Sequence, residues 1–315
     1  MRLVVAQDHP STQAALRADG GESQGHYCAD ITEEQTLRAR AAYFACVDHL
    51  DEIIGDFLAL LERDGLLDNT IVVYTSDHGE LGGEHGLWWK QTWNEASIRV
   101  PLIISTPAHR RGEQPATIID DPVSLGDLFT TLCGLAGVPV PEGLDGLDLT
   151  SAVRGEHCPA LAERPGVFVE NLNPYPAAGR EYRLMRSPRY KYIAFNECED
   201  LAFDLLEDPD EQHNIAGRTS GEGTDELERL REAIYADFSF GSAIESVRRE
   251  QSEFAGRYPS RVKLSTSNQI MRGDGVLVEA DQPLFQPDIA SEDPRMDFTD
   301  CPQERRTPRR VRWPS

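Results

Sequence analysis

Apolar side chains recur every three or four positions between residues 32 and 63, which is the spacing of one helix face. Thr32 is a suitable N-cap, and Gln35 three positions later completes a capping-box pattern. Glu33 and Glu34 place negative charge at the positive end of the helix dipole. The sequence therefore predicts an amphipathic helix from Thr32 to Arg63 whose apolar stripe faces a core. The stripe consists of Phe44, Val47, Leu50, Ile54, Phe57 and Leu61.

Two short apolar runs follow this helix. The run from Ile71 to Tyr74 is unbroken and rich in β-branched residues, which is typical of a strand buried on both faces of a parallel sheet. Pro101 to Ser105 predicts a second strand, and Val123 to Leu135 predicts another amphipathic helix that ends at Gly134 or Gly137. These elements together predict an α/β layer.

Beyond residue 160 the apolar segments become short and are separated by turn residues. This pattern predicts an antiparallel sheet, with a helix over Glu226 to Phe238 that covers it. The predicted strands are Val167 to Glu170, Tyr182 to Met185, Tyr190 to Phe195 and Ala202 to Leu205.

The chain is predicted to contain four segments. Residues 1–30 form a polar arm and residues 31–158 the α/β layer. Residues 159–245 form the antiparallel sheet and its helix, and residues 246–315 form an extended tail that is acidic and then basic.

Composition limits the classes of partner. A net charge of −23 over 315 residues argues against a nucleic-acid partner, because phosphate binding depends on a basic face. Six scattered cysteines without a C-x-x-C pair argue against a zinc ribbon. No stretch approaches the roughly 20 apolar residues of a membrane span. The expected location is cytoplasmic by default, with export left open.

Candidate chemistry follows the first predicted strand. Asp77 and His78 come directly after it, at the end of a strand where open α/β sheets bind ligands. Their side chains are predicted to lie within about 6 Å of each other, a spacing that allows a shared ion. Lys90 follows a glycine-rich turn that could fold it over the same site. Glu95 and Arg99, four residues apart, are predicted to form a structural ion pair.

The segments SDHGE (76–80) and GLWWK (86–90) resemble the sulfatase family of the alkaline-phosphatase-like superfamily. The resemblance is closest to its choline-sulfatase-like and phosphonate-monoesterase-like branches, and it spans roughly residues 30–240. It continues through NEASIRVPLIIS (94–105), YRLMRSPRYKYI (182–193) and FDLLEDPDEQHNIA (203–216). The fold implied is α/β: the C-terminal part of an alkaline-phosphatase-like sandwich, with a smaller antiparallel-sheet α+β subdomain.

The resemblance implies hydrolysis of a small-molecule sulfate ester. It makes Asp77 and His78 ligands of a divalent metal, with Ca²⁺ expected first and Mn²⁺ or Mg²⁺ as alternatives. It makes Lys90 the cation that binds the sulfate oxygens. His85 is a weaker candidate for substrate binding, and a role as a turn residue satisfied by backbone groups is at least as good an interpretation.

The family's nucleophile motif is missing. Sulfatases carry a formylglycine, made from Cys or Ser, in a C/S-x-P/A-x-R motif near the start of their fold. The nearest match begins at Ser105, but His109 stands at the arginine position and Arg110 is one residue late. We therefore expect the C-terminal portion of a sulfatase, inactive without the missing N-terminal half and partnered with that polypeptide or with its own copies.

Two other functions stay open at this stage. One is a phosphonate or phosphate diesterase of the same superfamily, whose site is nearly the same. The other is a catalytically inactive chain that serves as a non-catalytic partner of another polypeptide.

Overall fold

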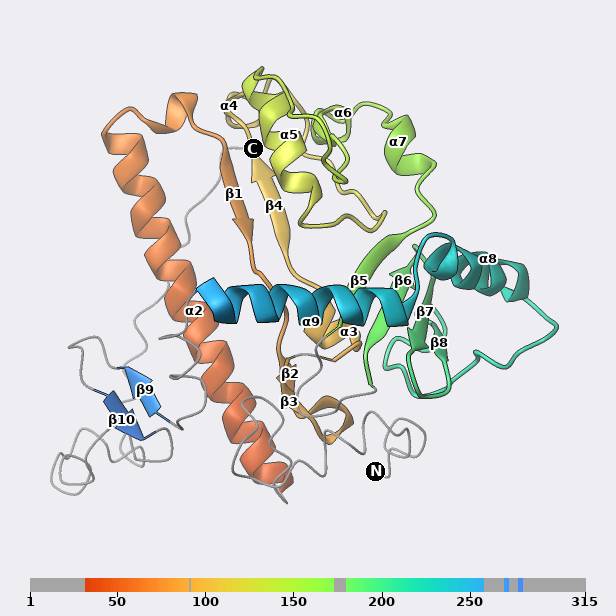
Figure 1. The fold of residues 1–315 in the computed structure, drawn as a ribbon. Coiled ribbons are helices and arrows are strands. Elements are labelled where there is room, and N and C mark those ends of the chain that lie inside the picture. Colours follow the sequence, from red (N-terminus) through yellow and green to blue (C-terminus); the bar gives the residue numbers. More distant parts are fainter. Residues whose placement is uncertain (1–31, 91, 173–179, 258–268, 272–276, 280–315) are drawn as a thin grey trace, which may run out of the picture. The chain divides into compact units, whose positions relative to one another are not determined.

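The computed structural model describes residues 32–90, 92–172, 180–257, 269–271 and 277–279, and Figure 1 shows their helices and strands. The chain divides into two units, residues 1–250 and residues 251–315. The predicted polar arm and most of the predicted tail lie outside the described residues.

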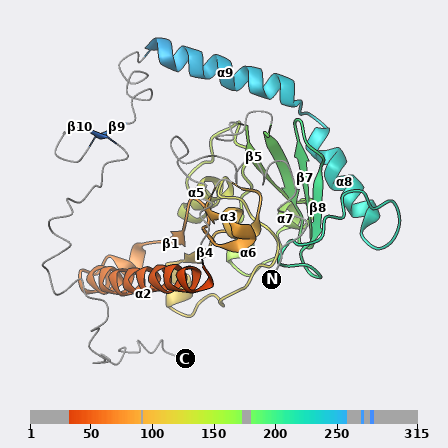
Figure 2. The same cartoon turned by 90° about the horizontal axis from the view of Figure 1, so that it is seen from below.

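The first described helix, α2 (Glu33–Arg63), begins with the predicted capping box. The Gln35 amide N–H donates to Thr32 Oγ1 at 3.2 Å, and the Thr32 N–H donates to Gln35 Oε1 at 2.8 Å. Figure 2 shows α2 as one uninterrupted rod. Near its N-terminal end, Arg40 Nε donates to the Gly82 carbonyl at 2.6 Å.

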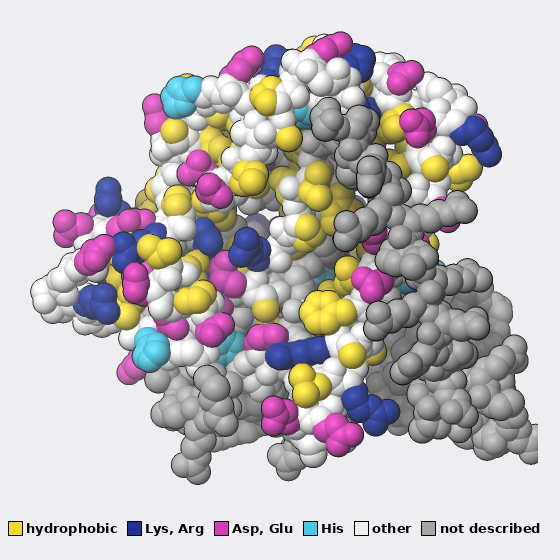
Figure 3. Space-filling view, turned by 180° about the vertical axis from the view of Figure 1, so that it is seen from behind, with side chains coloured by type: hydrophobic (Ala, Val, Ile, Leu, Met, Phe, Trp, Pro, Cys, Tyr) yellow, Lys and Arg dark blue, Asp and Glu magenta, His cyan; other side chains and the backbone are white. Residues whose placement is uncertain are grey.

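The predicted burial of the apolar stripe on α2 is wrong. No residue of α2 is buried, and Phe44 and Phe57 are 64% and 57% exposed. The helix packs mainly near its two ends, against β2 (Leu81–Gly82) and the 3₁₀ turn η1 (Leu67–Asn69). Exposed hydrophobic side chains also lie among charged ones on the face seen in Figure 3.

The two strands of the predicted α/β layer are β1 (Val72–Thr75) and β4 (Leu102–Ser105). They pair with each other in antiparallel register, Val72 opposite Ser105, so the predicted parallel arrangement is not found among the described residues. β1 is half-buried and Ile103 of β4 is 60% exposed. An unbroken apolar run does not encode strand direction, which explains the difference.

The segment between these strands contains a small hairpin and a short helix. β2 pairs with β3 (Trp88–Trp89), and the turn η2 (Glu84–Gly86) joins them. Gly83 begins this turn at φ 99°, a left-handed conformation that favours glycine. The hairpin leads into α3 (Glu95–Ile98).

Four helices follow β4: α4 (Pro107–Arg110), α5 (Asp127–Ala136), α6 (Thr150–Val153) and α7 (Pro159–Ala162). The predicted helix near residues 123–135 corresponds to α5, which ends at Gly137 with φ 69°. Asp127 is buried and accepts two hydrogen bonds from Arg164, at 2.6 and 2.8 Å. This ion pair fixes the start of α5 against the segment after α7.

The antiparallel sheet is confirmed. Its strands are β5 (Val167–Asn171), β6 (Tyr182–Arg186), β7 (Tyr190–Phe195) and β8 (Leu201–Asp204), in that spatial order. Every residue of β7 and β8 is buried. One face packs on α8 (Thr224–Tyr235) through Leu227, Leu230 and Ile234, and the other contains Trp93, Leu184 and Ile193.

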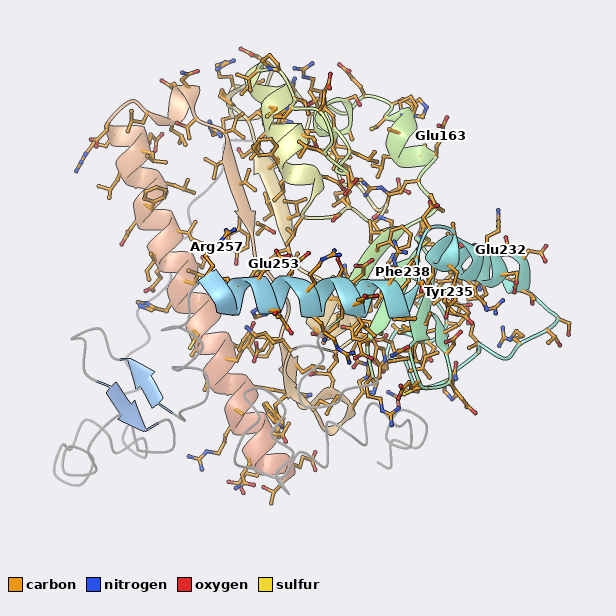
Figure 4. All side chains as sticks on the ribbon, viewed as in Figure 1. Glu163, Glu232, Tyr235, Phe238, Glu253 and Arg257 are labelled. Atoms are coloured by element: carbon orange, nitrogen blue, oxygen red, sulfur yellow. The ribbon has the colours of Figure 1, made fainter. Side chains whose placement is uncertain are left out.

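A further helix, α9 (Phe240–Arg257), covers residues for which the sequence predicted an extended tail from 246 onward. Glu, Arg, Gln and Ser fill much of this segment, and three of these are good helix formers even where the apolar pattern is weak. Tyr235 and Phe238 lie near the start of α9 (Figure 4). Phe240 packs edge-on against both, with ring centroids 6.5 and 5.0 Å away. Strands β9 (Gln269–Met271) and β10 (Leu277–Glu279) form an antiparallel pair.

None of the helices in the described part of the chain combines the length and the apolar character that crossing a bilayer requires.

Candidate active site

The turn after β1 is held by its own hydrogen bonds. Ser76 Oγ donates to the His78 carbonyl at 2.9 Å, and the His78 N–H donates to Asp77 Oδ1 at 3.0 Å. The Gly79 N–H donates to the Ser97 carbonyl of α3 at 2.8 Å. A Cβ on Gly79 would lie 2.0 Å from the Ala96 carbonyl oxygen, so only glycine allows this approach to α3.

Asp77 and His78 lie together, within the predicted distance. Asp77 Oδ1 is 3.5 Å from His78 Nε2. The Asp77 side chain is 83% exposed and that of His78 is 34% exposed, so both can be reached from solvent.

The hydrogen bonds of His78 assign its tautomer. His78 Nδ1 lies 2.8 Å from the Gly79 carbonyl, which can only accept, so Nδ1 carries the proton. Nε2 then keeps its lone pair, and Lys90 Nζ donates to it at 2.6 Å. The imidazole nitrogen that faces Asp77 is therefore the one that can accept a proton or bind a cation.

Lys90 reaches this point from the end of the β2–β3 hairpin, as the glycine-rich turn predicted. The structure thus brings together a carboxylate, an imidazole and an ammonium group, although Lys90 is 12 residues from His78 in sequence. The carboxylate and the imidazole can bind a metal ion, and the ammonium group can bind an oxyanion that accompanies the ion.

His85 occupies a different position. It is 6% exposed, has φ 54°, and its Nδ1 has no hydrogen-bond partner. Burial lowers the pKa of His85, while nearby Glu211 raises it and Lys191 lowers it further. Its predicted role in substrate binding stays a prediction.

The fit to a metal ion is partial. Two donor atoms 3.5 Å apart can both lie within about 2.0–2.4 Å of one ion. However, no group of three or more His, Cys, Asp or Glu side chains suited to a metal occurs in the described part of the chain. Since Ca²⁺ takes six to eight oxygen ligands, Asp77 and His78 fit as part of a metal site.

The side chains of residues 105–110, the nearest match to the nucleophile motif, form hydrogen bonds that hold the local structure together. Arg110 Nη1 donates to the carbonyl and the Oγ of Ser105, at 2.9 and 3.0 Å. His109 Nδ1 accepts from the Thr106 N–H at 3.2 Å, and its Nε2 lies 3.0 Å from the Val153 carbonyl. These contacts use His109 as a helix cap that is bonded to α6.

Sequence reasoning missed a buried ion cluster beside this site. Lys191 of β7 is fully buried, and its Nζ contacts carboxylate oxygens of Glu95 and Glu211. The predicted partner of Glu95 was Arg99; the structure pairs it with Lys191 and Arg186 instead. One signal was available, because Lys191 is one of only three lysines in the chain.

Comparison with known proteins gives two family-model matches. The model described as "Sulfatase" matches residues 4–138, and the model described as "N-sulphoglucosamine sulphohydrolase, C-terminal" matches residues 83–236. Together they include the Asp77–His78 turn, Lys90 and all four strands of the antiparallel sheet.

Individual relatives agree with this assignment. The chain is 33% identical over 213 residues to arylsulfatase K of Xenopus laevis, covering 65% of this chain and 39% of the relative. It is 36% identical over 197 residues to choline-sulfatase of Rhizobium meliloti (strain 1021), covering 61% and 36%. The solved structure of the putative sulfatase yidJ from Bacteroides fragilis has a TM-score of 0.54 at 26% identity, covering 73% and 48%. The chain therefore spans less than half the length of each of these three proteins.

Proposed function

The chain belongs to the sulfatase family, and we propose that it supplies the metal-binding turn and the anion-binding lysine of a site that hydrolyses a sulfate ester. The observation that carries this proposal is the contact series from Lys90 Nζ to His78 Nε2 to Asp77 Oδ1, at 2.6 and 3.5 Å. This contact series joins a cation to two side chains of metal-ligand types, which supports the proposal.

Lys90 binds the anionic oxygens of the ester. Its ammonium group has three donors, and in this structure one of them is given to His78 Nε2. A chain with a net charge of −23 repels an anion at long range, so a local cation has to attract it. Binding of the ester turns Lys90 from His78 toward a sulfate oxygen.

Asp77 and His78 hold the divalent ion, for which we propose Ca²⁺, with Mn²⁺ and Mg²⁺ as alternatives. When bound, such an ion withdraws charge from the ester oxygens as the S–O bond breaks. The protein's own contribution is orientation. The Nδ1–H of His78 donates to the Gly79 carbonyl, and the His78 backbone N–H holds the Asp77 carboxylate in the turn.

The nucleophile comes from outside these 315 residues. None of the chain's Cys or Ser residues stands in a C/S-x-P/A-x-R motif, and covalent catalysis needs an activated oxygen close to the sulfur. Apolar side chains of α2 are exposed, and this exposure is an argument for a further polypeptide that covers them. We propose that this polypeptide completes the sulfatase fold and brings the formylglycine.

A complementation assay tests this function. The 315-residue chain would be co-expressed with the N-terminal part of the Rhizobium meliloti choline-sulfatase, and hydrolysis of choline sulfate and of an aryl sulfate would be measured with Ca²⁺ or Mn²⁺. The chain alone should show no turnover and the pair should show hydrolysis that Asp77→Ala abolishes. Turnover by the chain alone that disappears in Ser105→Ala would overturn the proposal.

A binding measurement separates catalysis from the non-catalytic alternative. Calorimetric titration of the purified pair with Ca²⁺ should show one site that Asp77→Ala removes and that Asp68→Ala, an exposed aspartate on η1, leaves unchanged. A pair that forms but binds no metal would favour the reading of an inactive partner chain.

A further inference from the structure

The buried charge cluster beside the site consists of Lys191, Glu95 and Glu211. Lys191 is 0% exposed, and its Nζ donates to the Trp93 carbonyl at 2.8 Å and to Glu95 Oε1 at 3.1 Å. It also pairs with Glu211 Oε1, whose side chain is 3% exposed. Even when buried charges are paired, the free energy lost on leaving water can exceed what the pairing returns, so the cluster calls for a reason beyond stability.

The cluster joins three elements that are distant in sequence. Lys191 lies in β7 and Glu95 begins α3, while Glu211 follows β8 at φ 54°. Glu211 Oε2 accepts from the Glu95 backbone N–H at 2.7 Å, although 116 residues separate the two. A left-handed backbone at a non-glycine residue costs free energy and persists where the surroundings hold it. The first turn of α3 is therefore bound to the antiparallel sheet at both its backbone and its side chain.

The other end of α3 supports the Asp77–His78 turn. The Gly79 N–H donates to the Ser97 carbonyl, and Gly79 packs against the Ala96 carbonyl so closely that no side chain fits. Any movement of α3 is transmitted to Gly79 and so to the carbonyl that accepts from His78 Nδ1. The path from Lys191 to His78 contains only direct contacts.

The segment that follows the hairpin contacts the cluster, because Lys191 Nζ donates to the Trp93 carbonyl, three residues after Lys90. His85, in the turn of the hairpin, is buried, and the charges of Glu211 and Lys191 act on its pKa. The cluster is therefore next to both segments that supply site residues.

We infer that Lys191, Glu95 and Glu211 are positioning residues, which hold α3 and the β2–β3 hairpin so that Asp77, His78 and Lys90 stay in contact. This role rests on the proposed function of those three side chains. It assigns to the antiparallel sheet a direct part in the site, beyond the packing of its own core.

Exchange of the Gly79 amide proton tests this inference without metal or substrate, so the result is independent of whether the chain acts on sulfate esters. The variant is Lys191→Met with Glu211→Gln, which removes one positive and one negative charge and keeps a side-chain oxygen for the Glu95 N–H. The matched control is Arg189→Gln with Asp204→Asn, which neutralises another ion pair of the same sheet at 2.8 Å. Amides of Leu230 and Ile234 in α8 report on the sheet core.

The expected result is at least tenfold faster exchange at Gly79 in the Lys191→Met/Glu211→Gln variant, with Leu230 and Ile234 unchanged and with no change at Gly79 in the control. His78 should also lose its Nδ1–H to Gly79 contact, which a shift of the ring ¹⁵N resonances reports. The single variant Glu211→Gln, which keeps Lys191, should recover most of the protection of the Gly79 amide. Equal acceleration at all three amides, unchanged exchange at Gly79, or failure of the variant to fold while the control folds would overturn the inference and leave the cluster a general stability element.

Discussion

The antiparallel sheet and helix α2 both carry many apolar side chains and differ in their burial. Every residue of β7 is buried, and the apolar side of α8 closes over that sheet. In α2, which has a longer apolar stripe, no residue is buried. A hydrophobic pattern thus specifies which side chains can form a core, and the elements placed opposite it decide whether the core exists.

Core truncation should separate the two regions most strongly. Phe203→Ala in β8, where the side chain is 2% exposed, should destabilise the chain by about 4 kcal/mol, since it removes a large ring from a packed core. Phe57→Ala in α2 should change stability by less than about 0.5 kcal/mol. Urea unfolding followed by fluorescence measures both, and equal effects would show that α2 is buried in solution.

The site lies between these regions and should affect activity more than stability. In the complemented enzyme, Lys90→Met should reduce kcat/KM by roughly 150-fold, or about 3 kcal/mol of transition-state stabilisation. The midpoint of thermal unfolding should stay within about 2 °C of the parent, because Lys90 is only half-buried. A large loss of stability with little loss of activity would reverse this assignment.

Acid should weaken the well-packed ion pairs first. Burial raises the pKa of Asp127, but hydrogen bonds from Arg164 and from the Ser124 and Leu147 backbone outweigh it and lower the pKa below 3.8. A carboxyl group whose pKa is lower in the folded chain than in the unfolded chain stabilises the fold at pH values above its unfolded-chain pKa. This contribution is therefore present above about pH 4 and is lost as the pH falls further. Asp127→Asn should cost roughly 2 kcal/mol at pH 7 and should flatten the dependence of stability on pH below 4, measured by urea unfolding at several pH values.

The most local effect is expected at the cap of α2. Thr32→Ala removes the side-chain acceptor for Gln35 and should cost about 1 kcal/mol of helix stability. Because no α2 residue is buried, this loss should appear as fraying of the first turn, seen as faster amide exchange at Gln35 and Thr36, with the global unfolding midpoint unchanged. A shift of that midpoint would mean that α2 folds cooperatively with the sheet.

Local features were the part of the fold that the sequence could predict. The cap at Thr32, the extent of α2, and the four strands of the antiparallel sheet depend on residues within a few positions of one another. The approach of Asp77 to His78 was predicted for the same reason, and Lys90 joins them across a single hairpin.

Features that depend on distant residues could not be predicted. The antiparallel pairing of β1 with β4 and the exposure of α2 are set by the elements that surround them. The contacts of Lys191 with Glu95 and of Glu95 with Glu211 join residues 96 and 116 positions apart, and nothing in a local pattern specifies such contacts. Helix α9 was missed because its apolar spacing is weak although its residues favour helix.

The exposed apolar side chains of α2 also give this negatively charged chain a surface through which two copies can associate. In dilute buffer, the excess of negative charge keeps molecules apart, because each repels its neighbours over a Debye length of about 30 Å at 0.01 M salt. At 1 M salt this range falls to about 3 Å, and exposed side chains such as Leu37, Phe44 and Phe57 can then meet across two molecules. Ionic strength therefore sets the distance at which one copy of α2 meets another.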